Sequence, residues 1–134
     1  MIDNYENGEA VVKVDKKEVE AYARCAMRAA AEKSAHDLVA IDISNYLSVA
    51  DYFVIVTGNN DKQIAAIAKE VEKELFEKYH LKVANREGDA QQNWVLLDFE
   101  DIVVHIFSPE ARNEYRLEKL WGEAPSFKIK EEKI

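Results

Sequence analysis

Two runs of mostly apolar residues, 94–99 and 102–107, are separated only by Glu100 and Asp101, and this spacing limits the fold more than any other feature. The runs are rich in β-branched and aromatic residues, so we expect an antiparallel hairpin closed by a two-residue turn. One face of this hairpin is wholly apolar, and we assign it to the core. Facing positions step together along a hairpin, so its expected pairs are Phe99 with Ile102, Leu97 with Val104, and Val95 with Ile106.

The opposite face of the expected hairpin mixes large apolar side chains with an acid and a histidine. One interpretation is that another helix covers this face, with its polar groups satisfied at the edge. The other is a binding surface, because tryptophan is favoured at interaction hot spots and an acidic neighbour selects a basic partner. A slip of one residue would exchange the two faces, so the assignment depends on the turn. This second face carries Trp94, Leu96 and Asp98 opposite Phe107, His105 and Val103.

Three segments carry the signals of helices. Apolar residues recur at spacings of three and four over 16–35, and again from residue 61 onward. Pro109 suits the first turn of a closing helix that runs to about residue 121. The first two helices begin with capping-box patterns, formed by Asp15 with Glu18 and by Asn60 with Gln63.

Further strands are expected at 38–43, 52–57 and 81–86, the last followed by a glycine-containing loop at 87–89. Together with the hairpin they predict an α/β fold with a mixed five-stranded sheet packed with helices. We expect a single domain over 16–121, with a loose leader over 1–15 and a flexible tail over 122–134.

The charge balance bears on possible partners. The 134 residues include 26 acidic and 18 basic side chains, a formal charge of −8 that opposes direct binding to a phosphate backbone. A single cysteine allows no internal disulfide or zinc pair, which suits a reducing compartment. We see no signal peptide and no apolar run of the roughly 20 residues that cross a bilayer, so we expect a soluble cytoplasmic protein without membrane contact.

No pattern of catalytic, cofactor-binding or metal-binding residues emerges from the sequence. The three histidines are far apart, and Cys25 lies among alanines without an activating neighbour. Gly58 follows a strand and precedes a helix, as in nucleotidyltransferases, but the acids Asp98 and Glu100 lie some forty residues beyond it. We keep a nucleotide-dependent transferase that uses these three residues as the alternative function.

Several blocks follow one another in a specific order along this sequence: DYFVIVTG at 51–58, QIAAIA at 63–68, Glu87-Gly88, WVLLDF at 94–99, DIVVHIF at 101–107, and Arg112, Tyr115 and LEKLW at 117–121. Together these blocks resemble the ribosomal silencing factor family, also called the Iojap family, and the resemblance spans about residues 19–121. A glutamate, Glu100, stands where a glycine is common in the family, and Asn59 and Asn60 replace a more usual serine-containing helix start.

The resemblance implies a protein that is not an enzyme and has a nucleotidyltransferase-like topology without the catalytic acids. It implies binding to the large ribosomal subunit through a ribosomal protein of the intersubunit face, which blocks joining of the small subunit. The family's contact surface centres on the strand that here runs from Trp94 to Asp98, so the second hairpin face is the expected partner-binding site. Self-association through the same face, as a homodimer, remains open.

Overall fold

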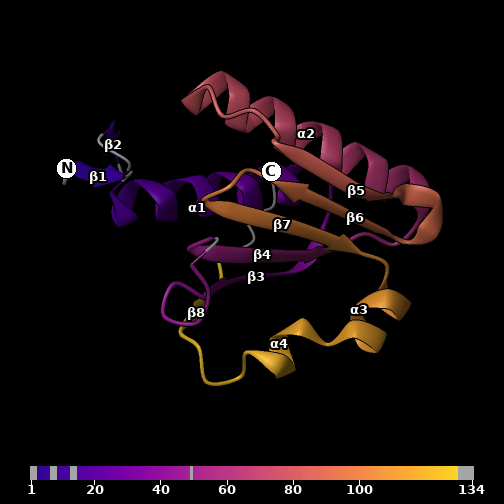
Figure 1. The fold of residues 1–134 in the computed structure, drawn as a ribbon. Helices are drawn as coiled ribbons and strands as arrows, with labels where there is room; N and C mark the ends of the chain where they lie inside the picture. Colours follow the sequence, from indigo (N-terminus) through magenta and orange to yellow (C-terminus); the bar gives the residue numbers. More distant parts are fainter. Residues whose placement is uncertain (1–2, 7–8, 13–14, 49, 130–134) are drawn as a thin grey trace.

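A six-stranded mixed sheet forms the centre of the molecule, and helices lie on both of its faces (Figure 1). The computed structural model describes residues 3–6, 9–12, 15–48 and 50–129. The strand order is β5-β6-β7-β4-β3-β8, and β1 and β2 pair in a separate sheet. The strands are β1 (Asp3–Glu6), β2 (Glu9–Val12), β3 (His36–Asp42), β4 (Tyr52–Thr57), β5 (Asn85–Asp89), β6 (Trp94–Asp98), β7 (Ile102–Phe107) and β8 (Ser126–Phe127); the helices are α1 (Lys16–Glu32), α2 (Asp61–Tyr79), α3 (Pro109–Tyr115) and α4 (Leu117–Leu120), with a 3₁₀ turn at Ala90–Gln92.

The predicted hairpin and its register are confirmed. Leu97 faces Val104 and Val95 faces Ile106 across β6 and β7. The ladder continues into the turn, where the Phe99 amide donates to the Ile102 carbonyl at 2.9 Å. On its other side β7 pairs with β4 in parallel, although the two strands are far apart in the sequence. The predicted mixed α/β class is therefore confirmed.

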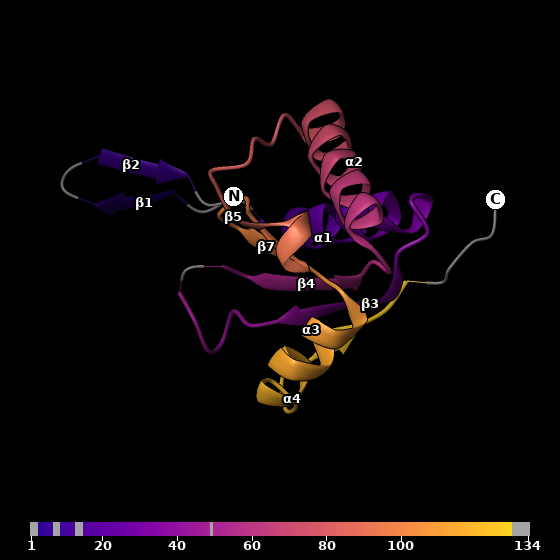
Figure 2. The ribbon, with the colours of Figure 1, turned by 90° about the vertical axis from the view of Figure 1, so that its right-hand side faces the viewer.

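Helices α1 and α2 cover the face of the sheet that the hairpin was expected to bury (Figure 2). Leu97, Val104 and Ile106 are fully buried beneath them. The two helices meet through an edge-on contact of Tyr22 with Tyr79, whose ring centroids lie 4.8 Å apart. The smaller helices α3 and α4 lie on the opposite side of the sheet (Figure 2).

The predicted helix starts are confirmed, but the capping boxes are not closed as expected. The Asp15 carboxylate accepts from the Lys17 amide, and the Asn60 side chain accepts from the Gln63 amide at 2.9 Å. Glu18 instead accepts from the Tyr22 hydroxyl. The Gln63 side chain accepts from the Asn59 amide and donates to two carbonyls at the end of α1, so it ties the two helices together.

The third predicted strand lies four residues later than expected. Residues 81–84 are irregular, and β5 occupies Asn85–Asp89, the stretch expected to be a loop. Leu81 and Val83 produced the strand-like pattern because they pack against the core from a connecting segment. The edge strand itself is exposed along its whole length and has no apolar signal.

The C-terminal region also differs from expectation. The closing helix is interrupted at Arg116, which adopts a left-handed backbone with φ of 48° and separates α3 from α4. Ser126 and Phe127 pair with Ile41 and Ala40 of β3, so the sheet has six strands and not five. Near the start of the chain, β1 and β2 pair with each other within the segment expected to be a leader. Residues 130–134 lie outside the described part, and the domain boundaries stay a prediction.

The hairpin turn places Glu100 in the left-handed region, with φ of 74°. This conformation suits glycine better than a residue with a Cβ atom. We expect Glu100→Gly to raise the free energy of unfolding by about 0.5–1 kcal/mol, measured by urea denaturation. The control Glu123→Gly alters an exposed residue without a positive φ, so it should give no gain. A gain of equal size in both variants would show that turn strain is not the cause.

Candidate protein-binding face

The second hairpin face lies on the side of the sheet away from α1 and α2, and the structure brings all six predicted residues together there. The three residues from β6 and Val103 of β7 are half-buried. His105 and Phe107 are more enclosed, at 7% and 3% exposure. The surface is therefore open over β6 and covered toward the end of β7. We call it the hairpin face; its facing pairs are Trp94 with Phe107, Leu96 with His105, and Asp98 with Val103.

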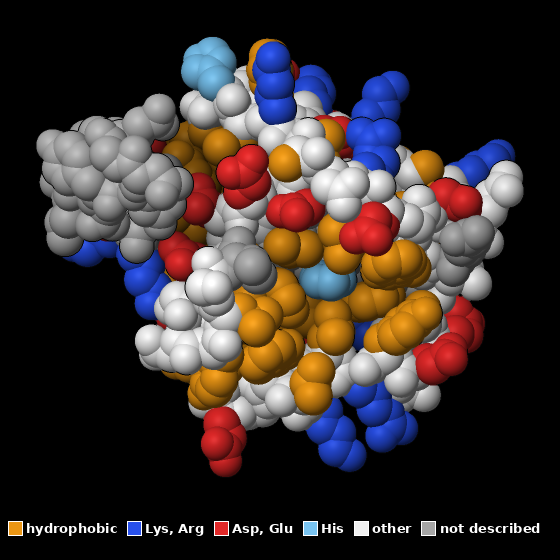
Figure 3. Space-filling model, in the orientation of Figure 1, with side chains coloured by type: hydrophobic (Ala, Val, Ile, Leu, Met, Phe, Trp, Pro, Cys, Tyr) orange, Lys and Arg blue, Asp and Glu red, His pale blue; other side chains and the backbone are white. Residues whose placement is uncertain are grey.

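A continuous row of aromatic contacts crosses this side of the sheet. Phe53 of β4 meets the His105 ring edge-on at 5.0 Å, and His105 stacks on Phe107 at 5.8 Å. Tyr115 and Tyr46, which end the row, are 59% and 49% exposed. Figure 3 shows apolar side chains gathered around one histidine on this side of the molecule. The aromatic row runs through Tyr46, Trp121, Phe53, His105, Phe107 and Tyr115.

Helices cover part of this face, as one of the two interpretations expected, and its role as a binding surface stays a prediction. Helix α3 covers the end of β7, because Tyr115 stacks on Phe107 with ring centroids 5.6 Å apart. Trp121, just after α4, packs against Phe53. Neither helix closes over β6, where Trp94 and Leu96 keep part of their side chains accessible. The accessible apolar surface thus includes the residues with the most hydrophobic area to offer a partner.

His105 is buried in this face without a polar partner. Neither of its ring nitrogens has a hydrogen bond among the described residues. Burial lowers the pKa of His105 to about 4, because the charged imidazolium would lose its hydration between the rings of Phe53 and Phe107. His105 is therefore neutral at pH 7 and fills space between aromatic rings.

Acidic groups gather where the hairpin turns. The Asp98 carboxylate accepts from the Glu100 amide at 2.7 Å, which fixes the turn. Burial raises the pKa of Asp101, and the neighbouring Asp51 and Glu100 carboxylates raise it further. Figure 3 shows acidic side chains along one border of the apolar surface. The negative charge that composition indicated thus lies partly beside this face.

Trp94 is positioned by a glycine on the neighbouring strand. Gly88 of β5 has a φ of +74°, and a Cβ atom placed there would lie 2.4 Å from the Trp94 carbonyl oxygen and 2.6 Å from Cε3 of its ring. The indole therefore packs directly on the Gly88 backbone. A side chain at this position would displace the ring.

The residues considered from sequence as possible catalytic or metal-binding groups lie apart from one another. His36 contacts Asp37 and Asn59, and His80 ends α2. Cys25 is buried in α1, and burial raises the pKa of its thiol. A Cβ on Gly58 would meet Ile64 and Ile67 at 2.9 and 3.0 Å, so this glycine allows close packing of a strand and a helix.

Within the described ranges, a group of acids that could hold a cation joins α1 and α2. Glu32, Glu70 and Glu74 place carboxylate oxygens within 4.8 Å of one another. None of the residues singled out from sequence belongs to this group. No helix in the described part of the chain is long and apolar enough to span a membrane.

Sequence reasoning missed Phe53, Tyr115 and Trp121 as parts of this surface. Phe53 alternates with buried residues along β4, but its place beside His105 depends on the parallel pairing of β4 with β7. No local signal marks that pairing. The block LEKLW contains Trp121, but its contact with Phe53 arises from the break at Arg116.

The chain is an α/β domain whose accessible apolar surface lies on one side of its sheet, and known proteins share its sequence and fold. Residues 16–134 match the family described as ribosomal silencing factor during starvation. The chain is 44% identical over 102 residues to ribosomal silencing factor RsfS of Bacillus subtilis (strain 168), with 76% of this chain and 86% of that protein covered. The chain belongs to the ribosomal silencing factor family, as the resemblance in its sequence implied.

Two further relatives extend the comparison. A crystal structure of a protein from Chromobacterium violaceum has a TM-score of 0.73 and 30% identity, and the match covers 84% of this chain and 93% of that one. A mouse protein named mitochondrial assembly of ribosomal large subunit protein 1 is 32% identical over 95 residues, which cover 67% of this chain and 40% of that protein.

Proposed function

We propose that this protein binds the large ribosomal subunit through a basic ribosomal protein of the intersubunit face, and that its bulk then blocks joining of the small subunit. The family description and the large-subunit name of the mouse relative support the choice of partner. Translation is repressed by steric obstruction, which requires no chemical step. The protein acts in the cytoplasm, with the ribosome as its target.

The observation that carries this proposal is the half-open hairpin face. Trp94 and Leu96 are half-buried and face Phe107 and His105 of the aromatic row. A partner that covers β6 would complete their burial, and a central tryptophan is a typical energetic anchor of an interface.

Charge supports a basic protein as the direct contact. Asp98 lies on the hairpin face opposite Val103 and next to the acids of the turn, so a cationic partner surface would complement these groups. The formal charge of −8 on the chain repels bare phosphate backbones. The two effects together favour docking on protein over docking on RNA.

The geometry favours ribosome binding over the alternative function, a nucleotide-dependent transferase. The Asp98 carboxylate accepts from the backbone amide of Glu100 and so fixes the turn, and Gly58 is packed against Ile64 and Ile67. A transferase would need two acids that converge on a metal near the glycine turn. Titration with nucleotide and magnesium separates the two functions, because saturable binding would favour the transferase.

Replacement of Trp94, the proposed anchor of the interface, tests the proposal. Trp94→Ala is expected to weaken cosedimentation with large subunits at least tenfold, since truncation of a central aromatic anchor costs about 2 kcal/mol or more. Sucrose gradients with purified subunits measure both the bound protein and the fraction of joined ribosomes. Circular dichroism and urea denaturation establish that the variant is folded.

Phe76→Ala provides the matched control. Phe76 is 46% exposed on α2, on the other side of the sheet, so its loss should leave cosedimentation unchanged. Undiminished binding of folded Trp94→Ala would remove this residue from the site, and binding to small subunits alone would overturn the proposed function. Sedimentation of the free protein at low concentration shows whether a homodimer competes for the same face.

A further inference from the structure

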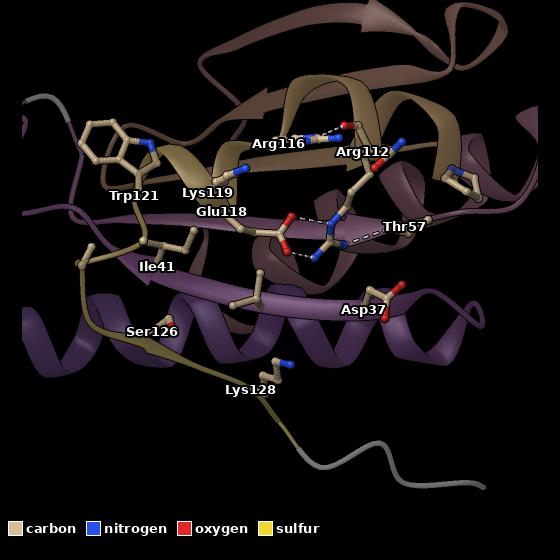
Figure 4. A pocket seen from close by; sticks show the side chains of 15 residues that line it. Asp37, Ile41, Thr57, Arg112, Arg116, Glu118, Lys119, Trp121, Ser126 and Lys128 are labelled. Atoms are coloured by element: carbon tan, nitrogen blue, oxygen red, sulfur yellow. Dashed lines mark hydrogen bonds and ion pairs between the residues drawn. The ribbon is translucent and has the colours of Figure 1, made fainter.

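A pocket of about 580 Å³ lies on the same side of the sheet as the hairpin face, but between β3, the α3–α4 segment and the residues around β8 (Figure 4). Its walls include Val39 and Ile41 of β3 and the side chain of Trp121. Because these walls are apolar and one is a flat indole, they suit a flat apolar group. Trp121 stands between this pocket and the aromatic row, through its contact with Phe53.

The charge of the pocket is opposite to that of the chain. Four basic and two acidic side chains line it, a formal charge of +2 in a chain whose formal charge is −8. Arg112 is neutralised locally, because it binds both carboxylate oxygens of Glu118 and donates to the Thr57 hydroxyl at 2.8 Å. Figure 4 shows this pair in the middle of the pocket. The remaining positive charge therefore comes from other residues.

Lys119 and Lys128 supply that charge from opposite sides. Their ammonium groups have no ion pair or hydrogen bond with any residue in the described ranges. Figure 4 shows Lys119 on the side of α4 and Lys128 on the side of the chain that follows β8. The Arg116 guanidinium has no ion pair with an acid in the described ranges either, and its Nε donates to the Asn113 carbonyl. Three cations without acidic partners thus surround apolar walls.

From this arrangement we infer that the pocket binds a small organic phosphate monoester that carries a flat apolar group. A phosphate dianion balances the formal charge of the lining, and lysine and arginine are its usual ligands in proteins. The flat group lies against Trp121 and the aliphatic side chains of β3. The inference does not depend on the proposed ribosome docking, although Trp121 belongs both to the pocket and to the aromatic row.

Phenyl phosphate, a dianion joined to one ring, is the probe for this site. The chain has two tryptophans, so Trp94→Phe leaves Trp121 as the sole tryptophan, on the wall of the pocket. Phenyl phosphate is expected to change the fluorescence of this variant in a saturable way, with half-saturation at about 1 mM or below. Inorganic phosphate should compete, and phenol should bind at least about tenfold more weakly. Isothermal titration of the wild-type chain provides the same affinity without the reporter substitution.

The double variant Lys119→Gln/Lys128→Gln tests whether these two lysines bind the phosphate group. It is expected to weaken phenyl phosphate binding at least about tenfold, whereas Lys62→Gln/Lys69→Gln, an equal charge change on exposed residues of α2, should leave the affinity unchanged. All four lysines are exposed, so both variants should fold. No saturable signal up to about 10 mM, or equal affinities of the two double variants, would overturn the inference.

Discussion

Gly88→Ala is expected to lower the free energy of unfolding by about 3 kcal/mol and to weaken docking on large subunits at least tenfold. The new Cβ would meet the Trp94 carbonyl oxygen and ring at 2.4 and 2.6 Å, closer than real contacts allow, in a backbone with φ of +74°. Either β5 shifts away from β6 or the indole leaves its place. Urea denaturation measures the free energy of unfolding, and sucrose-gradient cosedimentation measures docking on large subunits.

Gly122→Ala is the control for this substitution. A Cβ on Gly122 would approach its nearest neighbour, the Lys119 carbonyl oxygen, at 3.4 Å, an ordinary contact. This variant should change stability by no more than about 0.5 kcal/mol. If Gly88→Ala were as stable as Gly122→Ala and docked normally, the contact between Gly88 and the indole would not position Trp94.

Replacement of the buried His105 by phenylalanine is expected to remove one contribution to the pH dependence of the free energy of unfolding. The folded pKa of His105 is about 4, below its ordinary value of 6.5, so between these values the unfolded chain binds a proton that the folded chain does not. The contribution is complete above pH 6.5 and is lost as the pH falls toward 4. Relative to His105→Phe, the wild-type free energy of unfolding should fall by about 3 kcal/mol from pH 7 to pH 4.

Urea denaturation of both chains across this range tests the expectation, because the carboxylates titrate equally in each and cancel in the difference. Phenylalanine occupies a similar volume between Phe53 and Phe107 and needs no polar partner. His80→Asn removes an exposed histidine from the end of α2 and is the control. A constant difference between wild type and His105→Phe at all pH values would show that His105 does not stay neutral when folded.

The hairpin of β6 and β7 was predictable because residues close together in the sequence determine its register. Two residues between two apolar runs set the register, and the register assigned Leu97 to the core and Trp94 to the accessible face. The edge strand β5 was misplaced because an exposed strand of polar residues has no alternation to detect. Apolar residues in the segment before it, such as Leu81, mimic a strand by packing on the core from a loop.

The rest of the candidate surface depends on contacts between distant segments. Phe53 reaches His105 only because β4 pairs in parallel with β7, and Trp121 reaches Phe53 only because the chain bends at Arg116. Arg116 has a left-handed backbone although it is not a glycine, so its residue type does not predict the bend. The family resemblance pointed to the strand from Trp94 to Asp98, but the extent of the apolar surface follows from tertiary structure.

The parallel pairing of β4 with β7 also has a consequence for how the chain folds. The two central strands are joined by the whole segment that contains α2, β5 and β6, so the middle of the sheet closes only after a long loop has been ordered. During synthesis, β4 cannot complete its pairing with β7 until Phe107 has been added. The hairpin face is therefore complete only when most of the sequence has been translated.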